Sequence, residues 1–111
     1  MRELSAEYLI LSACLNDNRY FDSLELSASD FFEPFHQTLW ELGSALAAEG
    51  KSVDVVTLCE LASQEGIDLN ASAVAEIQVN FVSGAAIKQH EKIMKNRVRI
   101  RDMQAMSVSI S

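Results

Sequence analysis

The chain has 111 residues, a net charge of −7 and an apolar content of 49%. This length fits one domain with a single hydrophobic core. No apolar run approaches the roughly 20 residues that cross a bilayer and no secretory signal is recognisable, so we expect a cytoplasmic protein without membrane contact. Cys14 and Cys59 lie in separate apolar segments without metal-ligand spacing, and we expect both to be reduced thiols.

Charge is distributed unevenly along the chain. Residues 1–87 carry fourteen acidic and three basic residues, a net charge of −11, whereas residues 88–111 carry six basic and two acidic residues, a net charge of +4. An acidic body repels the phosphate backbone, which argues against nucleic-acid binding by the body. The basic residues of the last segment are Lys88, Lys92, Lys95, Arg97, Arg99 and Arg101.

The first predicted helix covers residues 6–15. Ser5 precedes it and can cap it by accepting a hydrogen bond from an orphan backbone N–H. Apart from Glu7 and Ser12 the segment is apolar nearly all round, so we expect it to be the most central helix or one shared with a partner.

A second helix is predicted over residues 34–49, because Pro34 suits a first helical position and Gly50 suits a left-handed stop. Its apolar stripe, spaced at i, i+4, i+7 and i+11, consists of Phe35, Leu39, Leu42 and Leu46.

His36 lies one turn before Trp40 in this helix, and we expect the two rings to pack together at a helix edge in a structural role. A catalytic histidine would need an orienting carboxylate and a nucleophile, and the sequence identifies no such set. We therefore expect His36→Gln to cost little stability unless the ring is wedged against Trp40.

Two further helices are predicted to begin at Asp54 and Asn70, each a capping residue with an apolar residue before it and another four positions after it. Gly66 ends the first of these helices. Residues 53–58 are rich in β-branched side chains and residues 76–82 alternate polar with apolar, so either stretch also fits a strand. No other strand signals complete a sheet, which leaves an all-α fold as the economical prediction.

The last predicted helix, capped by Ser83, runs from residue 84 to about residue 106. It carries two incomplete apolar stripes, Ile87/Met94/Val98 and Ile93/Ile100/Met103, between its basic residues. A helix this long with two narrow stripes is expected to reach beyond its own domain. We therefore predict a globular helical body over residues 1–83 and a long basic helix over residues 84–111, within one domain overall.

The sequence contains no glycine-rich phosphate loop, no metal-spaced Cys/His cluster and no nucleophile motif. Its four glycines are far apart, which makes a phosphate cradle hard to build. We predict no catalytic, cofactor-binding or metal-binding residue, and the residues alone indicate a small helical interaction domain.

Four blocks of sequence, in order, resemble the N-terminal domain of DnaB-type bacterial and phage replicative helicases. They are SAEYLILSACLNDNRYFDSL, SASDFFEPFHQTLWELGSALAAEGKSVDVVTLCELASQEG, SAVAEIQ and SGAAIKQHEKIMKNRVRIRDM. The most specific pieces are Leu15-Asn16-Asp17-Asn18, Asp30-Phe31-Phe32 followed by Phe35-His36, and Val53-Asp54 leading into Val56-Thr57-Leu58.

The resemblance implies a compact, orthogonal array of helices that ends in the first arm of a helical hairpin through which subunits pair. It implies that residues 55–65 and 72–78 are helical. It further implies a collar domain that supports hexamer assembly and recruits primase or loader proteins, with ATP, Mg²⁺ and DNA handled by a separate motor domain. Ser12-Ala13 stands where the family usually has glycine, which suggests altered helix packing there. The chain ends inside the first arm, so we expect pairing through that arm to be incomplete.

We predict that Lys88, Lys92, Lys95 and Arg99 contact another subunit or a partner protein. The competing interpretation is a solvated helix face with internal pairs such as Glu91 with Lys95. A different class of function, a stand-alone DNA-binding or helicase-regulating protein that uses the basic helix, also fits six bases on one segment, although the acidic body opposes it.

Overall fold

The computed structural model describes residues 5–81 and 83–110, with side chains up to Arg101. Within these residues every regular element is helical and no strand is present, which confirms the all-α prediction. The two stretches with strand-like patterns lie mainly in α4 and α5. The elements are α1 (Ala6–Asn16), α2 (Tyr20–Ser23), the 3₁₀ helix η1 (Ala28–Asp30), α3 (Pro34–Ala48), α4 (Val55–Gln64), α5 (Ala71–Val79) and α6 (Ile87–Ile110).

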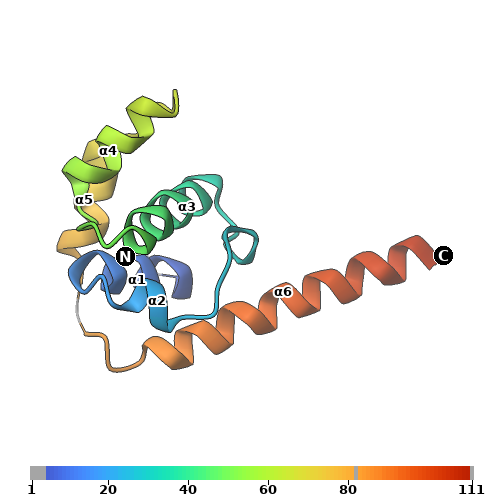
Figure 1. Ribbon diagram of the computed structural model, residues 1–111. Coiled ribbons are helices and arrows are strands. Elements are labelled where there is room, and N and C mark those ends of the chain that lie inside the picture. The colour runs from blue at the N-terminus through green and yellow to red at the C-terminus, as the bar shows by residue number, and fades with distance from the viewer. Residues whose placement is uncertain (1–4, 82, 111) are drawn as a thin grey trace.

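Helix α1 is the central element of the body, as predicted from the apolar residues on nearly all of its sides. It contacts α2, α3, α5 and α6, and Ile10, Leu11 and Cys14 on it are almost fully buried. Helix α3 also packs against α4, which in turn contacts α5 (Figure 1). Cys14 and Cys59 both carry free thiols.

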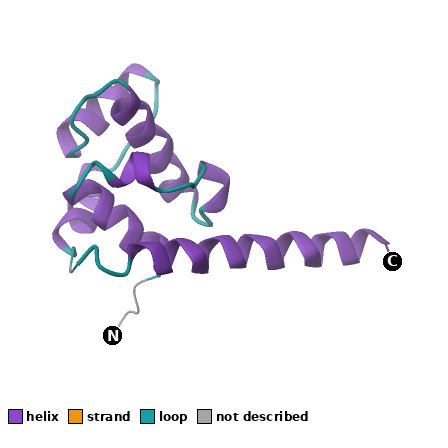
Figure 2. Ribbon diagram, turned by 60° about the horizontal axis from the view of Figure 1, so that its bottom comes forward, coloured by secondary structure: helices purple, strands orange, loops and turns teal. Residues whose placement is uncertain are grey.

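Helix α6 projects beyond the body, and its C-terminal part extends away from the other helices in both views (Figures 1 and 2). Its 24 residues span about 36 Å at 1.5 Å per residue. That length exceeds the two shorter dimensions of the molecule, 33 and 31 Å. None of the described helices combines the length and apolar character needed to cross a bilayer.

The start of α6 differs from the prediction, because the helix begins at Ile87 and not at residue 84. The Ser83 hydroxyl accepts a hydrogen bond from the Ala85 N–H at 3.1 Å, and the Ile87 N–H donates to the Gly84 carbonyl at 3.2 Å. Ser83 thus closes a tight turn before the helix, where we expected a cap. The apolar residue expected to precede this cap, Val82, and the side chain of Met103 lie outside the described residues.

The other helix boundaries follow the predicted local chemistry. The side chains of Ser5, Asp54 and Asn70 accept hydrogen bonds from the N–H groups of Tyr8, Thr57 and Ala73, at 3.2, 2.9 and 3.2 Å. Gly50 and Gly66 follow the ends of α3 and α4 with φ of 72°. Only glycine adopts this left-handed backbone at no steric cost.

An aromatic cluster fills the space between α2, α3 and η1. The ring of Trp40 lies 5.3 Å, centroid to centroid, from both Phe21 and Phe31. The predicted pairing of His36 with Trp40 is therefore wrong. The rings beside His36 are those of Tyr8 and Phe35, at 6.2 and 6.0 Å.

Two asparagines after α1 join distant segments. The Asn18 amide accepts a hydrogen bond from the Val53 N–H at 2.9 Å and donates to the Val53 carbonyl at 3.1 Å, which fixes the loop before α4. The Asn16 amide donates to the Gln78 carbonyl in α5 at 2.9 Å. The Leu15-Asn16-Asp17-Asn18 motif thus has a structural role.

The buried stripe of α3 leads to a first prediction. Leu39 is 2% exposed, and Leu39→Ala should lower the free energy of unfolding by about 2–5 kcal/mol because a cavity remains. Phe35 is half-buried, so Phe35→Ala should cost less. Val56, 73% exposed, provides the control, and Val56→Ala should change stability by less than about 0.5 kcal/mol. Urea unfolding measures all three, and a Leu39→Ala loss no larger than that of the control would refute the core assignment.

Candidate protein-contact site

The four predicted contact residues all lie on α6, but the structure divides them into two pairs. Lys88 and Lys95 turn toward the body. The Lys88 ammonium donates to the Ser23 carbonyl at 2.7 Å, and the Lys95 ammonium lies 3.7 Å from the Glu25 carboxylate.

Lys92 and Arg99 form the second pair and face solvent. Lys92 makes no hydrogen bond or ion pair with any residue that the structure describes. The Arg99 guanidinium donates only to the Asn96 side chain, at 3.3 Å, among the described residues. These two cations are therefore the ones available to a partner.

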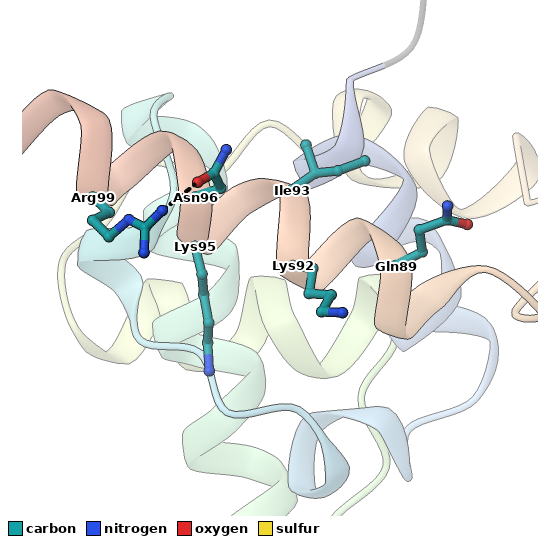
Figure 3. Close-up of a pocket in the computed structure, with 6 residues that line it drawn as sticks. All are labelled: Gln89, Lys92, Ile93, Lys95, Asn96 and Arg99. Carbon is teal, nitrogen blue, oxygen red and sulfur yellow. Dashed lines mark hydrogen bonds between the residues drawn. The ribbon is translucent and has the colours of Figure 1, made fainter.

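The face of α6 around this second pair is a shallow depression of about 610 Å³, whose lining side chains all project from this one helix (Figure 3). A single helix cannot enclose a small ligand, so the depression is suited to another protein element. Ile93, which lines it, and Ile100, two helical turns further along, are each 45% exposed. We call this surface the outer face of α6, and it consists of Gln89, Lys92, Ile93, Asn96, Arg99 and Ile100.

The opposite face of α6 is fixed to the body. Ile87 and Met94 are buried in the core. The buried Glu91 carboxylate accepts a hydrogen bond from the Glu25 N–H at 2.6 Å and lies 3.7 Å from the Lys88 ammonium. The expected pair of Glu91 with Lys95 is absent among the described residues, because Glu91 faces the body while Lys95 reaches Glu25.

A buried carboxylate, Glu7 on α1, is the polar centre of the body. Its two oxygens accept hydrogen bonds from the N–H groups of Phe32 and Glu33, at 2.9 and 3.2 Å, where the chain enters α3. The His36 Nδ1 lies 2.5 Å from one oxygen, and the Arg97 guanidinium lies 3.3 Å from the other. Glu7 thereby connects α1, the start of α3 and α6.

These contacts determine the charge of Glu7. Burial raises the pKa of Glu7, but the hydrogen bonds from His36, Phe32 and Glu33 and the electrostatic attraction of His36 outweigh it, so the pKa lies below its usual value. Glu7 therefore stays ionised at neutral pH. Sequence reasoning missed this pair, because Glu7 and His36 are far apart in the chain. The signal in the sequence that could have pointed to it is a single acidic residue in the first half of an otherwise apolar helix.

Ligand atoms of Glu7, Glu33 and His36 lie within 4.8 Å of one another, a spacing that can hold a metal ion. The surroundings fit this chemistry poorly. Both oxygens of Glu7 already accept backbone hydrogen bonds, and the Arg97 guanidinium places a positive charge beside them. The cluster is better suited to holding three segments of the chain together.

Replacing Glu7 tests this role through its pH dependence. Glu7→Gln should lower the free energy of unfolding by roughly 1–3 kcal/mol at pH 7, because the charged hydrogen bonds are lost. A lowered folded-state pKa gives stabilisation that is present above the unfolded value of about 4.3 and is lost as the pH falls through the folded value. The difference between parent and variant should therefore shrink toward zero on acidification, as measured by urea unfolding between pH 7 and pH 3.

Glu33→Gln is the matched control, because the Glu33 carboxylate also approaches His36 Nδ1, at 3.0 Å, but is 52% exposed. It should cost less than Glu7→Gln at pH 7. A Glu7→Gln cost that stays constant over the whole pH range would contradict the assignment. The small cost that the sequence suggested for His36→Gln no longer follows, since the ring is buried and holds Glu7.

Comparison with known proteins identifies the family. The family model described as DnaB-like helicase N terminal domain matches residues 1–96. The replicative DNA helicase DnaB of Buchnera aphidicola subsp. Baizongia pistaciae is 31% identical over 103 residues, which cover 88% of this chain and 22% of that protein. The replicative DNA helicase DnaB of Pasteurella multocida is 26% identical over 113 residues, covering 97% of this chain and 24% of that one. The chain thus spans under a quarter of the length of these relatives.

Solved structures share the fold. The N-terminal domain of DnaB helicase from Mycobacterium tuberculosis superposes with a TM-score of 0.87 at 18% identity, over 98% of this chain and 81% of that one. A DnaB-like replicative helicase, determined in a study of its interactions with primase, superposes with a TM-score of 0.80 at 18% identity, over 95% of this chain and 26% of that one. With the family model covering most of its length, the chain belongs to the DnaB-like helicase N-terminal domain family.

Proposed function

We propose that this chain acts as the collar domain of a replicative DNA helicase and works through protein–protein contacts. Its role is to support helicase oligomerisation and to recruit primase or a loader protein. In this proposal the domain is not catalytic by itself, and the ATP and Mg²⁺ chemistry of the family belongs to a motor domain outside these residues.

The observation that carries the proposal is the outer face of α6. Ile93 and Ile100 are half-exposed and lie two helical turns apart on a helix that extends past the body. Burying such side chains against another chain is favourable, at about 0.8 kcal/mol per CH₂ group. Lys92 and Arg99 on the same face supply charge that selects an acidic partner surface.

The partner class has support from a structural neighbour. One DnaB-like replicative helicase with the same fold was studied for its interactions with primase. The interaction with primase belongs to that neighbour. For this chain it makes primase the first partner to test.

The arrangement of the bases argues against a DNA-binding role. Four of the six basic residues of α6 are engaged with the body, namely Lys88 with Ser23, Lys95 with Glu25, Arg97 with Glu7 and Arg101 with Ser29. The body also carries a net charge of −11. DNA affinity depends on many phosphate contacts by free cations, which this surface does not offer.

Charge reversal on the outer face tests the proposal. The double variant Lys92→Glu/Arg99→Glu should weaken self-association or primase capture by roughly tenfold, because like charges then face an acidic partner. Its free energy of unfolding should change by less than about 0.5 kcal/mol, since both side chains are exposed. Sedimentation velocity, pull-down with the cognate primase and urea unfolding measure the three quantities.

Arg19→Glu is the control, because Arg19 is exposed and pairs only with Asp17 at 2.7 Å among the described residues. It should leave both associations unchanged. Associations of the double variant that equal those of the parent would refute the proposal. The proposal would also be refuted if the parent chain made no protein contacts and bound single-stranded or duplex DNA tightly, with strong salt dependence, in an anisotropy titration.

A further inference from the structure

A groove of about 590 Å³ runs between α3 and α4. Its floor is apolar and consists of Leu42, Ala45 and Leu46 of α3, Leu61 of α4 and Ile67 just beyond α4. Ile67 is 39% exposed, and the exposed Ala45 presents only a methyl group, so another chain can approach the floor closely. We call this surface the α3–α4 groove.

The rim of the α3–α4 groove is acidic. It carries the exposed Glu41 and Glu49 on α3, and Glu60 and Glu65 on α4 and its C-terminal cap. Lys51 pairs with Glu49 at 2.9 Å, whereas the other three glutamates form no ion pair with any residue that the structure describes. The carboxylates repel nucleic-acid phosphates and anionic lipid headgroups, and they are complementary to a protein that combines apolar with basic side chains.

The apolar floor favours a helix over an extended segment as the occupant. An extended peptide would place backbone N–H and C=O groups against side chains that cannot hydrogen-bond to them, which is unfavourable. An α-helix satisfies these groups internally and presents an apolar stripe to the floor. Glu41 and Glu49 are eight residues apart, about 12 Å along α3, so a helix lying along α3 would meet them with basic side chains about two turns apart.

The body of a second copy does not supply such a helix. Among described residues before α6 the only basic ones are Arg19 and Lys51, and each pairs with an acid of its own chain. Two bodies would therefore bring like charges together at the groove.

The α3–α4 groove is also separate from the outer face of α6. In the described part of the chain α6 contacts neither α3 nor α4. Figure 1 shows α4 on the side of the body away from α6. A protein bound in the groove would therefore leave the outer face of α6 free.

We propose that the α3–α4 groove binds a basic amphipathic helix of a separate protein. Such a helix carries apolar side chains spaced three or four residues apart, with lysine or arginine on both sides of the stripe. The inference goes beyond the proposed function, because it adds a second contact surface that does not involve α6.

A model peptide tests the proposal. The probe is a fluorescein-labelled peptide of about 18 residues, or five helical turns, with leucines in one stripe, lysines on both flanks and alanines elsewhere. The full chain should bind it in an anisotropy titration. Glu41→Lys/Glu60→Lys should bind it roughly tenfold more weakly, because like charges then face the peptide. Ile67→Ala, which keeps the net charge, should weaken binding about threefold, because apolar contact is lost.

Two controls separate docking in the groove from general charge attraction. Asp22→Lys/Glu76→Lys changes the net charge equally at exposed acids outside the groove and should bind the peptide within about threefold of the parent chain. A peptide of the same composition, with its leucines distributed around the helix, should bind roughly tenfold more weakly than the striped peptide. Urea unfolding of every variant checks that each remains folded.

Several results would overturn the inference. They are unchanged binding of the striped peptide by Glu41→Lys/Glu60→Lys, equal binding of the two peptides, and no binding at millimolar concentration. Loss of self-association by Glu41→Lys/Glu60→Lys in sedimentation equilibrium would make a second copy the occupant and would also overturn it. Lys92→Glu/Arg99→Glu should bind the striped peptide like the parent, so failure of the proposed function and failure of this inference are read from different variants.

Discussion

The buried carboxylate of Glu7 is the interaction on which the arrangement of this domain depends. It accepts hydrogen bonds from the backbone at the entry to α3, holds the imidazole of His36 and meets the guanidinium of Arg97 on α6. A buried, ionised carboxylate without partners would cost several kcal/mol, so α1, α3 and α6 are constrained to meet where those partners converge. This constraint fixes which face of α6 lies on the body and leaves Lys92, Ile93, Arg99 and Ile100 on the other.

The sequence segments that most resemble the helicase family mainly make contacts that stabilise the fold. Asn18 ties the end of α1 to Val53, and Asp54 caps α4 in a reciprocal pair with Thr57. Phe31 packs on Trp40 in the core. The surface proposed for partner contact lies elsewhere, on the solvent side of α6. Similarity of fold therefore leaves the partner surfaces free to differ among relatives.

Local signals in the sequence were sufficient for most of the fold. Caps at Ser5, Asp54 and Asn70 and stops at Gly50 and Gly66 depend on residues within one helical turn, so their chemistry can be read without the tertiary structure. The partners of Glu7 could not be predicted, because His36 and Arg97 come from distant segments. The division of the basic residues into two pairs could not be predicted either, since Lys88 and Lys95 are held by the Ser23 carbonyl at the end of α2 and by the Glu25 carboxylate after it. The start of α6 was misplaced because Ser83 closes a turn in a pattern that resembles a cap.

The most direct test of this account is to crosslink the outer face of α6 to the protein that covers it. A photoreactive amino acid at position 100, in an equal mixture of ¹⁴N- and ¹⁵N-labelled chains, distinguishes contacts between copies from contacts within one chain by mass spectrometry. The account predicts mixed-isotope products in which position 100 of one copy is joined to a second copy. Products confined to single chains, or no intermolecular products at concentrations where the chain sediments as an oligomer, would contradict it.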